Sequence, residues 1–254
     1  MSDVVVAQSG FVLEIRFNRP EKKNALTGAM YQAVEAAFRR ADEDPGLRVV
    51  LLTGTGDTFT SGNDIRDFQA RAATEEGVHA PPFLAALSSL SKPLVAAVNG
   101  AAIGVGTTML AHADLVVAAR SARFVMPFTS LGLVPEAASS LLFPRLVGHQ
   151  RASALLLLGE AINADKACDW GLVNRVVDDA DLMDVAADYV ARLAALPPEA
   201  VRQTKALIKH GRSDVPGRIE EELALFRQRL RSAEAAEAFQ AFVEKRKPDF
   251  SRFL

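Results

Sequence analysis

Short uninterrupted apolar runs constrain the fold of this 254-residue chain more than any other feature. Residues 49–53, 94–98 and 115–118 consist of Val, Leu and Ala, apart from Thr53 at the end of the first run. Runs of this kind are typical of strands that are buried on both faces of a sheet. Helical stretches alternate with such strands along the chain. This order predicts an α/β fold with a largely parallel sheet.

The first 46 residues predict a β-hairpin followed by a helix. Residues 4–6 and 11–17 are rich in Val, Ile and Phe, and Ser9-Gly10 lies between them. Thr27 is a suitable N-cap for the apolar helical repeat that follows it. Asp44-Pro45-Gly46 is expected to end this helix.

A change of pattern near residue 180 divides the chain into two expected parts. Residues 1–180 form the predicted α/β core, and residues 181–254 the predicted helical C-terminal region. Residues 66–90 fit neither pattern, and such a long connection is a candidate cover for a pocket. The helices expected in the C-terminal region cover residues 181–195, 199–210, 216–231 and 233–245.

Composition excludes several classes of function. The net charge of −2 does not suggest a nucleic acid or an anionic membrane as the main partner. A single cysteine, Cys168, argues against a disulfide and against a cysteine-based metal site, so no metal is expected. No signal peptide and no long uninterrupted apolar run is evident, and we therefore expect a soluble cytoplasmic protein.

Two glycine-containing turns could present backbone N–H groups to a ligand. In the first, Gly62 follows an apolar stretch and Asp64 could favour the start of a helix. The alternative is a plain strand-to-helix turn. In the second, Gly100, Gly104 and Gly106 precede an apolar helix, whose first N–H groups lack internal partners. The alternative there is close packing of the helix on the sheet.

Glu136 has two possible explanations at the level of sequence. Pro135 and Glu136 both suit the first turn of a helix, which would account for the carboxylate without any chemistry. Alternatively, apolar neighbours on both sides would raise the pKa of Glu136, and a raised pKa suits a catalytic base.

An ordered set of motifs covers most of the chain. They are Asn18-Arg19-Pro20, Asn24-Ala25-Leu26, Ser61-Gly62-Asn63-Asp64-Ile65, residues 93–106, Ala113-Asp114, residues 124–148 and residues 167–177 with Trp170-Gly171-Leu172-Val173. Taken in order, these motifs resemble the crotonase superfamily, the enoyl-CoA hydratase/isomerase family. This resemblance implies a spiral of ββα units, a helical C-terminal region that covers the pocket and supports oligomerisation, and assembly into trimers or pairs of trimers. It implies an acyl-CoA thioester as substrate and no separate cofactor, because CoA is part of the substrate.

The resemblance also implies roles for particular residues. The backbone N–H groups of Asn63 and Val105 would form an oxyanion hole, which stabilises the enolate formed beside a thioester. The expected CoA contacts are Lys22, Ala25, Ser61, Ile65, Lys245 and Lys247. The expected acyl pocket contains Phe68, Phe83, Thr108, Phe128 and Leu133.

The sequence departs from the hydratases of this family at the two positions where they carry catalytic glutamates. Those positions are Thr108 and Phe128 here, and neither side chain can act as a carboxylic acid. Glu136 instead resembles the single carboxylate of peroxisomal-type 3,2-trans-enoyl-CoA isomerases. The alternatives are a hydratase or another crotonase-type enzyme and, from a different class, a non-catalytic CoA-binding or scaffold protein.

Overall fold

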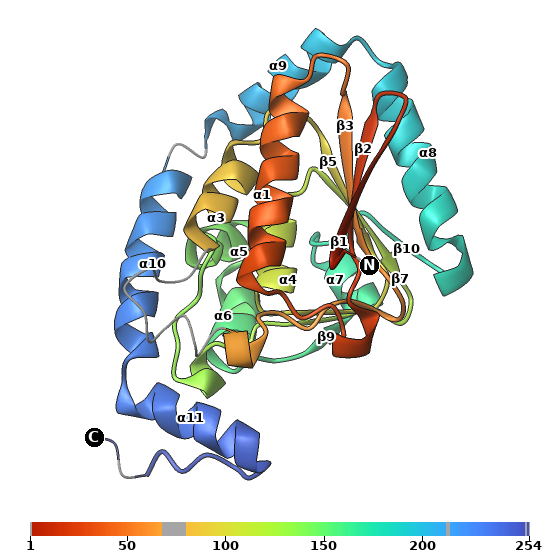
Figure 1. Ribbon diagram of the computed structural model, residues 1–254. Coiled ribbons are helices and arrows are strands. Elements are labelled where there is room, and N and C mark those ends of the chain that lie inside the picture. The colour runs from red at the N-terminus through yellow and green to blue at the C-terminus, as the bar shows by residue number, and fades with distance from the viewer. Residues whose placement is uncertain (1, 68–79, 212–213, 252, 254) are drawn as a thin grey trace.

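The larger of two sheets forms the centre of the molecule. The computed structural model describes residues 2–67, 80–211, 214–251 and 253 (Figure 1). Six strands lie in the order β1-β2-β3-β5-β7-β10. The predicted hairpin β1–β2 is antiparallel, and every other neighbouring pair in this sheet is parallel. The bounds are β1 Val4–Ser9, β2 Val12–Phe17, β3 Val49–Gly54, β5 Leu94–Val98, β7 Leu115–Ala119 and β10 Arg175–Val177.

The smaller sheet contains the strands that follow β3, β5 and β7 in the sequence. Its order is β4-β6-β8-β9, with β8 and β9 antiparallel. The chain thus passes from β3 to β4, from β5 to β6 and from β7 to β8, changing sheet each time. This arrangement confirms the expected ββα spiral. The bounds are β4 Thr58–Thr60, β6 Ala101–Ile103, β8 Arg123–Val125 and β9 Ile162–Asn163.

Both faces of the larger sheet are buried, as the apolar runs predict. Along β3, Val50 and Leu52 belong to the main core, whereas Val49 and Leu51 face a second core. Helix α1 (Gly28–Glu43) and helix α3 (Ala80–Ser89) lie on the main-core side (Figure 1). Helix α8 (Leu182–Ala195) covers the opposite face through Ala186 and Val190.

Helices dominate the C-terminal region, as predicted. They are α8, α9 (Pro198–His210), α10 (Val215–Leu230) and α11 (Ala233–Glu244). None of the helices in the described ranges combines the length and apolar character that crossing a bilayer requires. The division at residue 180 stays a prediction. The remaining elements are η1 Pro20–Lys22, α4 Val105–Thr108, η2 Met109–His112, η3 Thr129–Leu131, α5 Ser139–Val147, α6 His149–Leu157, α7 Ala164–Asp169 and η4 Asp179–Asp181.

An ion pair with a buried lysine connects α9 to the sheet. Lys205 is 5% exposed, and its Nζ donates to Asp114 Oδ2 at 2.6 Å and to Lys92 O at 2.6 Å. The same Asp114 oxygen accepts the N–H of Leu94, the first residue of β5, at 2.7 Å. Asp114 therefore connects two strands with a distant helix.

We predict that Lys205→Met destabilises the protein by about 2 kcal/mol, because it removes the charged hydrogen bonds to Asp114 and to Lys92 O. The matched control is Lys166→Met, which removes an exposed ion pair to Glu160 and should cost less than about 1 kcal/mol. Urea denaturation followed by circular dichroism measures both variants. Equal losses for the two variants would contradict the importance of the buried lysine.

Candidate active site

A single large cavity collects most of the residues that the sequence resemblance assigned to the site. Its volume is about 1040 Å³. One wall comes from the loops after β2 and β4, a second from the turn between β6 and α4, and a third from residues 127–133 with α10 and α11. The third wall is rich in aromatic side chains, namely Phe128, Phe226, Phe239 and Phe242. The cavity therefore has a polar side and an apolar side.

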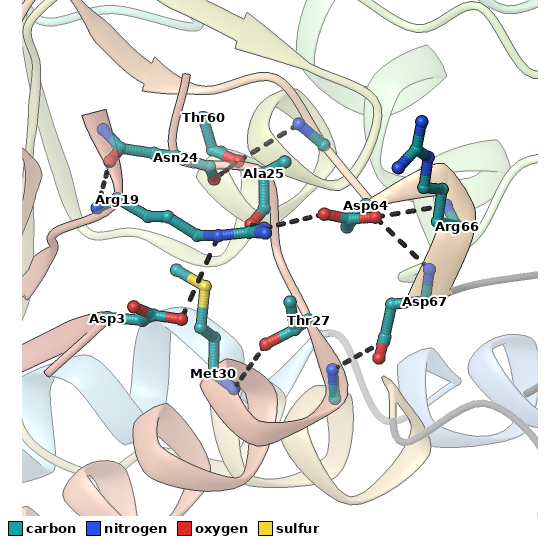
Figure 2. A network of polar contacts seen from close by, with 12 residues as sticks. Asp3, Arg19, Asn24, Ala25, Thr27, Met30, Thr60, Asp64, Arg66 and Asp67 are labelled. Atoms are coloured by element: carbon teal, nitrogen blue, oxygen red, sulfur yellow. Dashed lines mark hydrogen bonds and ion pairs between the residues drawn. The ribbon is translucent and has the colours of Figure 1, made fainter. Parts of the chain in front are cut away.

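Arg19 fixes the polar side of the cavity. Its Nη1 donates to Ala25 O at 3.1 Å and to Asp64 Oδ2 at 2.7 Å (Figure 2). The other carboxylate oxygen of Asp64 accepts the N–H groups of Arg66 and Asp67, as expected for the cap of a helical turn. Burial raises the pKa of Asp64, but the hydrogen bonds from Arg19 and from these N–H groups outweigh it and lower the pKa. Arg19 thus joins two loops that are distant in sequence.

A parallel bridge between Leu26 and Asn63 sets the orientation of the first predicted oxyanion donor. Leu26 N–H donates to Gly62 O at 2.8 Å, and Asp64 N–H donates to Leu26 O at 2.9 Å. These bonds use the groups on both sides of Asn63, so its own N–H takes no part in the bridge. Asn63 lines the cavity.

The second predicted donor, Val105, is the first residue of α4. Gly104 precedes it with φ = 56°, and its carbonyl accepts the N–H groups of Thr107 and Thr108. The first N–H groups of a helix have no acceptor within the helix, which leaves the Val105 N–H available for a ligand. Val105 lines the same cavity as Asn63. The helix is only four residues long, shorter than the apolar stretch suggested, because a 3₁₀ turn continues it.

Close packing at Gly62 and Gly106 brings the two donor segments together. Gly62 has φ = 86°, and a Cβ atom there would lie 2.9 Å from Ile103 O. A Cβ atom at Gly106 would lie 2.6 Å from Thr60 Cγ2. A larger residue at either position would push the loop after β4 away from the start of α4. The tight-packing alternative for the second turn is therefore realised at Gly106, and the ligand-facing role of both turns stays a prediction.

Glu136 does not lie in the first turn of a helix, so that expectation from the sequence is wrong. Helix α5 begins at Ser139, after Ala137 and Ala138, which have left-handed φ values of 60° and 53°. This conformation is costly for alanine and interrupts a helix. Ser139 donates to Glu136 O through its N–H and its hydroxyl group, and His112 Nε2 donates to Ala137 O at 2.8 Å. These bonds hold an irregular segment in place.

The Glu136 side chain is buried without a hydrogen-bond partner on one oxygen. It is 1% exposed, and Oε1 has no partner among the described residues. Burial, together with the nearby charge of Glu222, raises the pKa of Glu136 to about 8. Glu136 is not among the residues that line the cavity. A dry carboxyl group with a raised pKa has the properties of a general base.

Tyr31 interacts with two predicted site residues, Asn63 and Glu136. It is 4% exposed on α1, and its hydroxyl group donates to Asn63 Oδ1 at 2.7 Å. Burial raises the Tyr31 pKa well above its usual value, and the charges of Glu136 and Asp67 raise it further. Tyr31 therefore remains a neutral donor that orients Asn63 close to Glu136.

The structure places most, but not all, of the predicted ligand contacts around the cavity. The lining includes Lys22, Ala25, Ser61, Ile65, Phe128 and Leu133. The fully buried Thr108 is not in the lining, and its hydroxyl group donates to Val105 O at 3.4 Å. Phe83 packs against Tyr31 and Phe38 in the core between α1 and α3. Phe68 lies outside the described residues.

The predicted basic contacts are separated in space. Lys22 lines the cavity, whereas Lys245 and Lys247 follow the end of α11 and are exposed. Helix α11 nevertheless reaches the cavity through Phe239 and Phe242. Binding of CoA by either C-terminal lysine stays a prediction.

Three residues with clear structural roles were not identified as site residues from the sequence: Arg19, Tyr31 and Glu222. Arg19 belongs to one of the quoted motifs, which was the available signal. Tyr31 occupies a core-facing position of an amphipathic helix, and nothing local distinguishes it from a packing residue. Glu222 lies in a helix with many charged residues, which are usually exposed, yet its own side chain is buried at 4% exposure.

Comparison with known proteins agrees with this geometry. The chain matches the enoyl-CoA hydratase/isomerase family over residues 7–252. It is 36% identical to 1,2-epoxyphenylacetyl-CoA isomerase of Escherichia coli (strain K12), over 94% of this chain and 95% of that protein. It is also 36% identical to enoyl-CoA delta isomerase 2 of Rattus norvegicus, over 96% of this chain but only 64% of the rat protein.

A solved structure shows the same fold. The crystal structure of an enoyl-CoA hydratase/isomerase from Pseudoalteromonas atlantica T6c has a TM-score of 0.93 and 44% sequence identity, covering 98% of this chain and 100% of that one. The ββα spiral and this likeness define the chain as a crotonase-fold enzyme. The chain belongs to the enoyl-CoA hydratase/isomerase family, and the resemblance seen in its motifs is confirmed.

We predict that Gly62→Ala destabilises the protein by about 1–3 kcal/mol, because Ala would be strained at positive φ and would contact Ile103 O. Gly211→Ala is the control, since a Cβ atom there meets nothing within 4 Å. Urea midpoints of the two purified variants provide the measurement. A loss for Gly62→Ala no larger than that of the control would refute the packing constraint.

Proposed function

We propose that the protein converts 3-enoyl-CoA into trans-2-enoyl-CoA by a 1,3 proton transfer through Glu136. The observation that carries this proposal is the buried Glu136 carboxyl group, which has a pKa of about 8 and one oxygen without a hydrogen-bond partner in the described part of the chain. No second carboxylate stands at position 108 or 128, where Thr and Phe occur. A single acid–base group is sufficient for a double-bond shift, whereas hydration of this type uses two.

The reaction requires two steps at the same carboxyl group. The Glu136 carboxylate takes a proton from carbon 2, and the electron pair delocalises onto the thioester oxygen to give a dienolate. The Asn63 and Val105 N–H groups would stabilise that oxygen, and such donors contribute several kcal/mol in a dry site. The protonated Glu136 then returns the proton to carbon 4, which leaves the double bond between carbons 2 and 3.

The apolar wall of the cavity favours proton return over addition of water. Phe128 is 4% exposed and lines the cavity where hydratases carry an acid. Leu133 and the aromatic side chains of α10 and α11 make the same wall apolar. Exclusion of water limits hydration of the intermediate and strengthens the electrostatic interactions inside the site.

We predict that Glu136→Gln lowers kcat for double-bond migration by at least about 10²-fold with little change in CoA-ester binding, because the amide cannot accept the proton. The measurement uses a short panel of 3-enoyl-CoA esters, with the ultraviolet absorbance of the conjugated product as the readout. Glu220→Gln is the matched control, since Glu220 is exposed on α10.

Two results of these assays would favour another function over the isomerase. Formation of 3-hydroxyacyl-CoA from 2-enoyl-CoA, with no migration from 3-enoyl-CoA, would identify a hydratase. If the wild-type protein binds acyl-CoA without turnover, and Glu136→Gln changes nothing, the protein would be a non-catalytic CoA-binding member.

The raised pKa of Glu136 also predicts how stability depends on pH. The pKa is about 8 in the folded protein, compared with 4.5 for an unperturbed glutamate. The folded state therefore holds this proton more tightly, and its contribution to stability is present below pH 4.5 and lost as pH rises through 8. Glu136→Gln removes this loss and should be more stable than the wild type at pH 9 by a few kcal/mol.

Urea denaturation of the ligand-free protein at pH 5 and pH 9 tests this difference, with Glu220→Gln as the control. A constant difference in unfolding free energy between Glu136→Gln and wild type at the two pH values would show that Glu136 does not titrate as described.

A further inference from the structure

A second buried carboxylate lies near Glu136, on a helix that the proposed mechanism does not use. Glu222 on α10 is 4% exposed. Its Oε2 has no hydrogen-bond partner among the described residues, which is also true of Glu136 Oε1. Buried carboxylates are normally paired or hydrogen-bonded. Two incompletely partnered ones in one region call for a functional explanation.

Glu222 is attached to the segment that carries Glu136. Its Oε1 accepts the N–H of Ser140 at 2.9 Å and also the Ser140 hydroxyl group. The preceding residue, Ser139, donates to Glu136 O through both its N–H and its hydroxyl. Glu222 therefore anchors the first turn of α5, directly after the left-handed residues Ala137 and Ala138.

The surroundings of the two carboxyl groups differ. Burial raises the pKa of Glu222, and the hydrogen bonds from Ser140 and Ala138 together with the charge of Arg218 limit this rise without cancelling it. Glu136 Oε1 accepts no hydrogen bond from the described residues, and the charge of Glu222 raises the Glu136 pKa further. Differences of this kind are typical of paired acid–base groups.

We propose that Glu222 is a positioning residue that anchors the segment carrying Glu136 and, by holding a negative charge beside it, makes Glu136 a stronger base. The inference rests on the proposed function only in giving Glu136 the role of the base. A stronger base removes the weakly acidic proton beside a thioester more readily.

Other charged or titratable groups near the pair come from several elements. Tyr31 on α1 interacts with Glu136 and with Asp67, which follows Asp64 in the loop after β4. His112 on η2 bonds to Ala137 O, and Arg218 on α10 lies 3.3 Å from the Ser140 hydroxyl. Of these groups, Arg218 and Ser140 favour the charged form of Glu222. Tyr31 and His112 are not among the groups that lower the pKa of Glu222.

The test follows the Glu136 carboxyl group itself by ¹³C NMR in protein labelled at the glutamate carboxyl carbon. The Glu136 signal is identified by its loss in Glu136→Gln. In Glu222→Gln, which keeps an oxygen to accept the Ser140 N–H, the Glu136 titration midpoint should fall by about one pKa unit, a tenfold change in proton affinity. Glu220→Gln, on the exposed side of the same helix, should leave it unchanged.

A reciprocal measurement covers the case in which Glu222→Gln does not fold. Glu136 is still protonated, and so uncharged, while Glu222 titrates, so Glu136→Gln should leave the Glu222 midpoint unchanged, and in wild type that midpoint should lie below the one of Glu136. If the Glu136 midpoint in Glu222→Gln moves no more than in Glu220→Gln, or if Glu222 titrates above Glu136 in wild type, the proposal is overturned.

The NMR titration needs no substrate, so it separates this proposal from the proposed function. If the protein shifts no double bond but the two carboxyl groups titrate together, the isomerase assignment fails and the coupling stands. If the protein is an isomerase, the kcat/KM profile of Glu222→Gln should move to lower pH. An unchanged profile would show that Glu222 has only a structural role.

Discussion

The contact between the loops after β2 and β4 is the constraint on which the site depends. One parallel bridge, from Leu26 to the residues flanking Asn63, aligns the two loops, and Arg19 holds them from the side through Ala25 O and Asp64. Both predicted oxyanion donors are backbone groups, so no side chain can restore them if these loops separate. Close packing at Gly62 against Ile103 then brings the first donor next to the turn that carries Val105.

The second requirement is a carboxyl group that stays dry. Burial of an ionisable side chain costs free energy, and here it raises the pKa of Glu136 to about 8 rather than being relieved by a cation. The left-handed residues Ala137 and Ala138 add a further local cost. Packed helices and the hydrogen bonds from Ser139 and His112 compensate for both. Stability and the capacity for proton transfer are therefore in direct opposition at this position.

Sequence alone predicted the strands, the N-terminal hairpin and the four C-terminal helices, because each depends on local apolar periodicity. One of its two interpretations of Glu136, an acid in the first turn of a helix, was wrong, since Pro135 and Glu136 suit a first turn and nothing local predicts two consecutive left-handed alanines. Helix α3 falls in the stretch that had no readable pattern. Phe83, expected at the acyl chain, packs on Tyr31 instead. Tyr31 and Glu222 depend on contacts across 32 and 82 residues, which no local pattern contains.

The irregular segment before α5 has a consequence for how the family diversifies. The donors at Asn63 and Val105 belong to the two sheets and their turns, whereas Glu136 belongs to a separate stretch fixed by a few hydrogen bonds at its end. Under the proposed function, the residues that would bind the thioester oxygen and the residue that would transfer the proton therefore lie on different segments of backbone. A change confined to the segment that carries Glu136 would then alter the reaction, while the segments around Asn63 and Val105 would continue to bind the thioester.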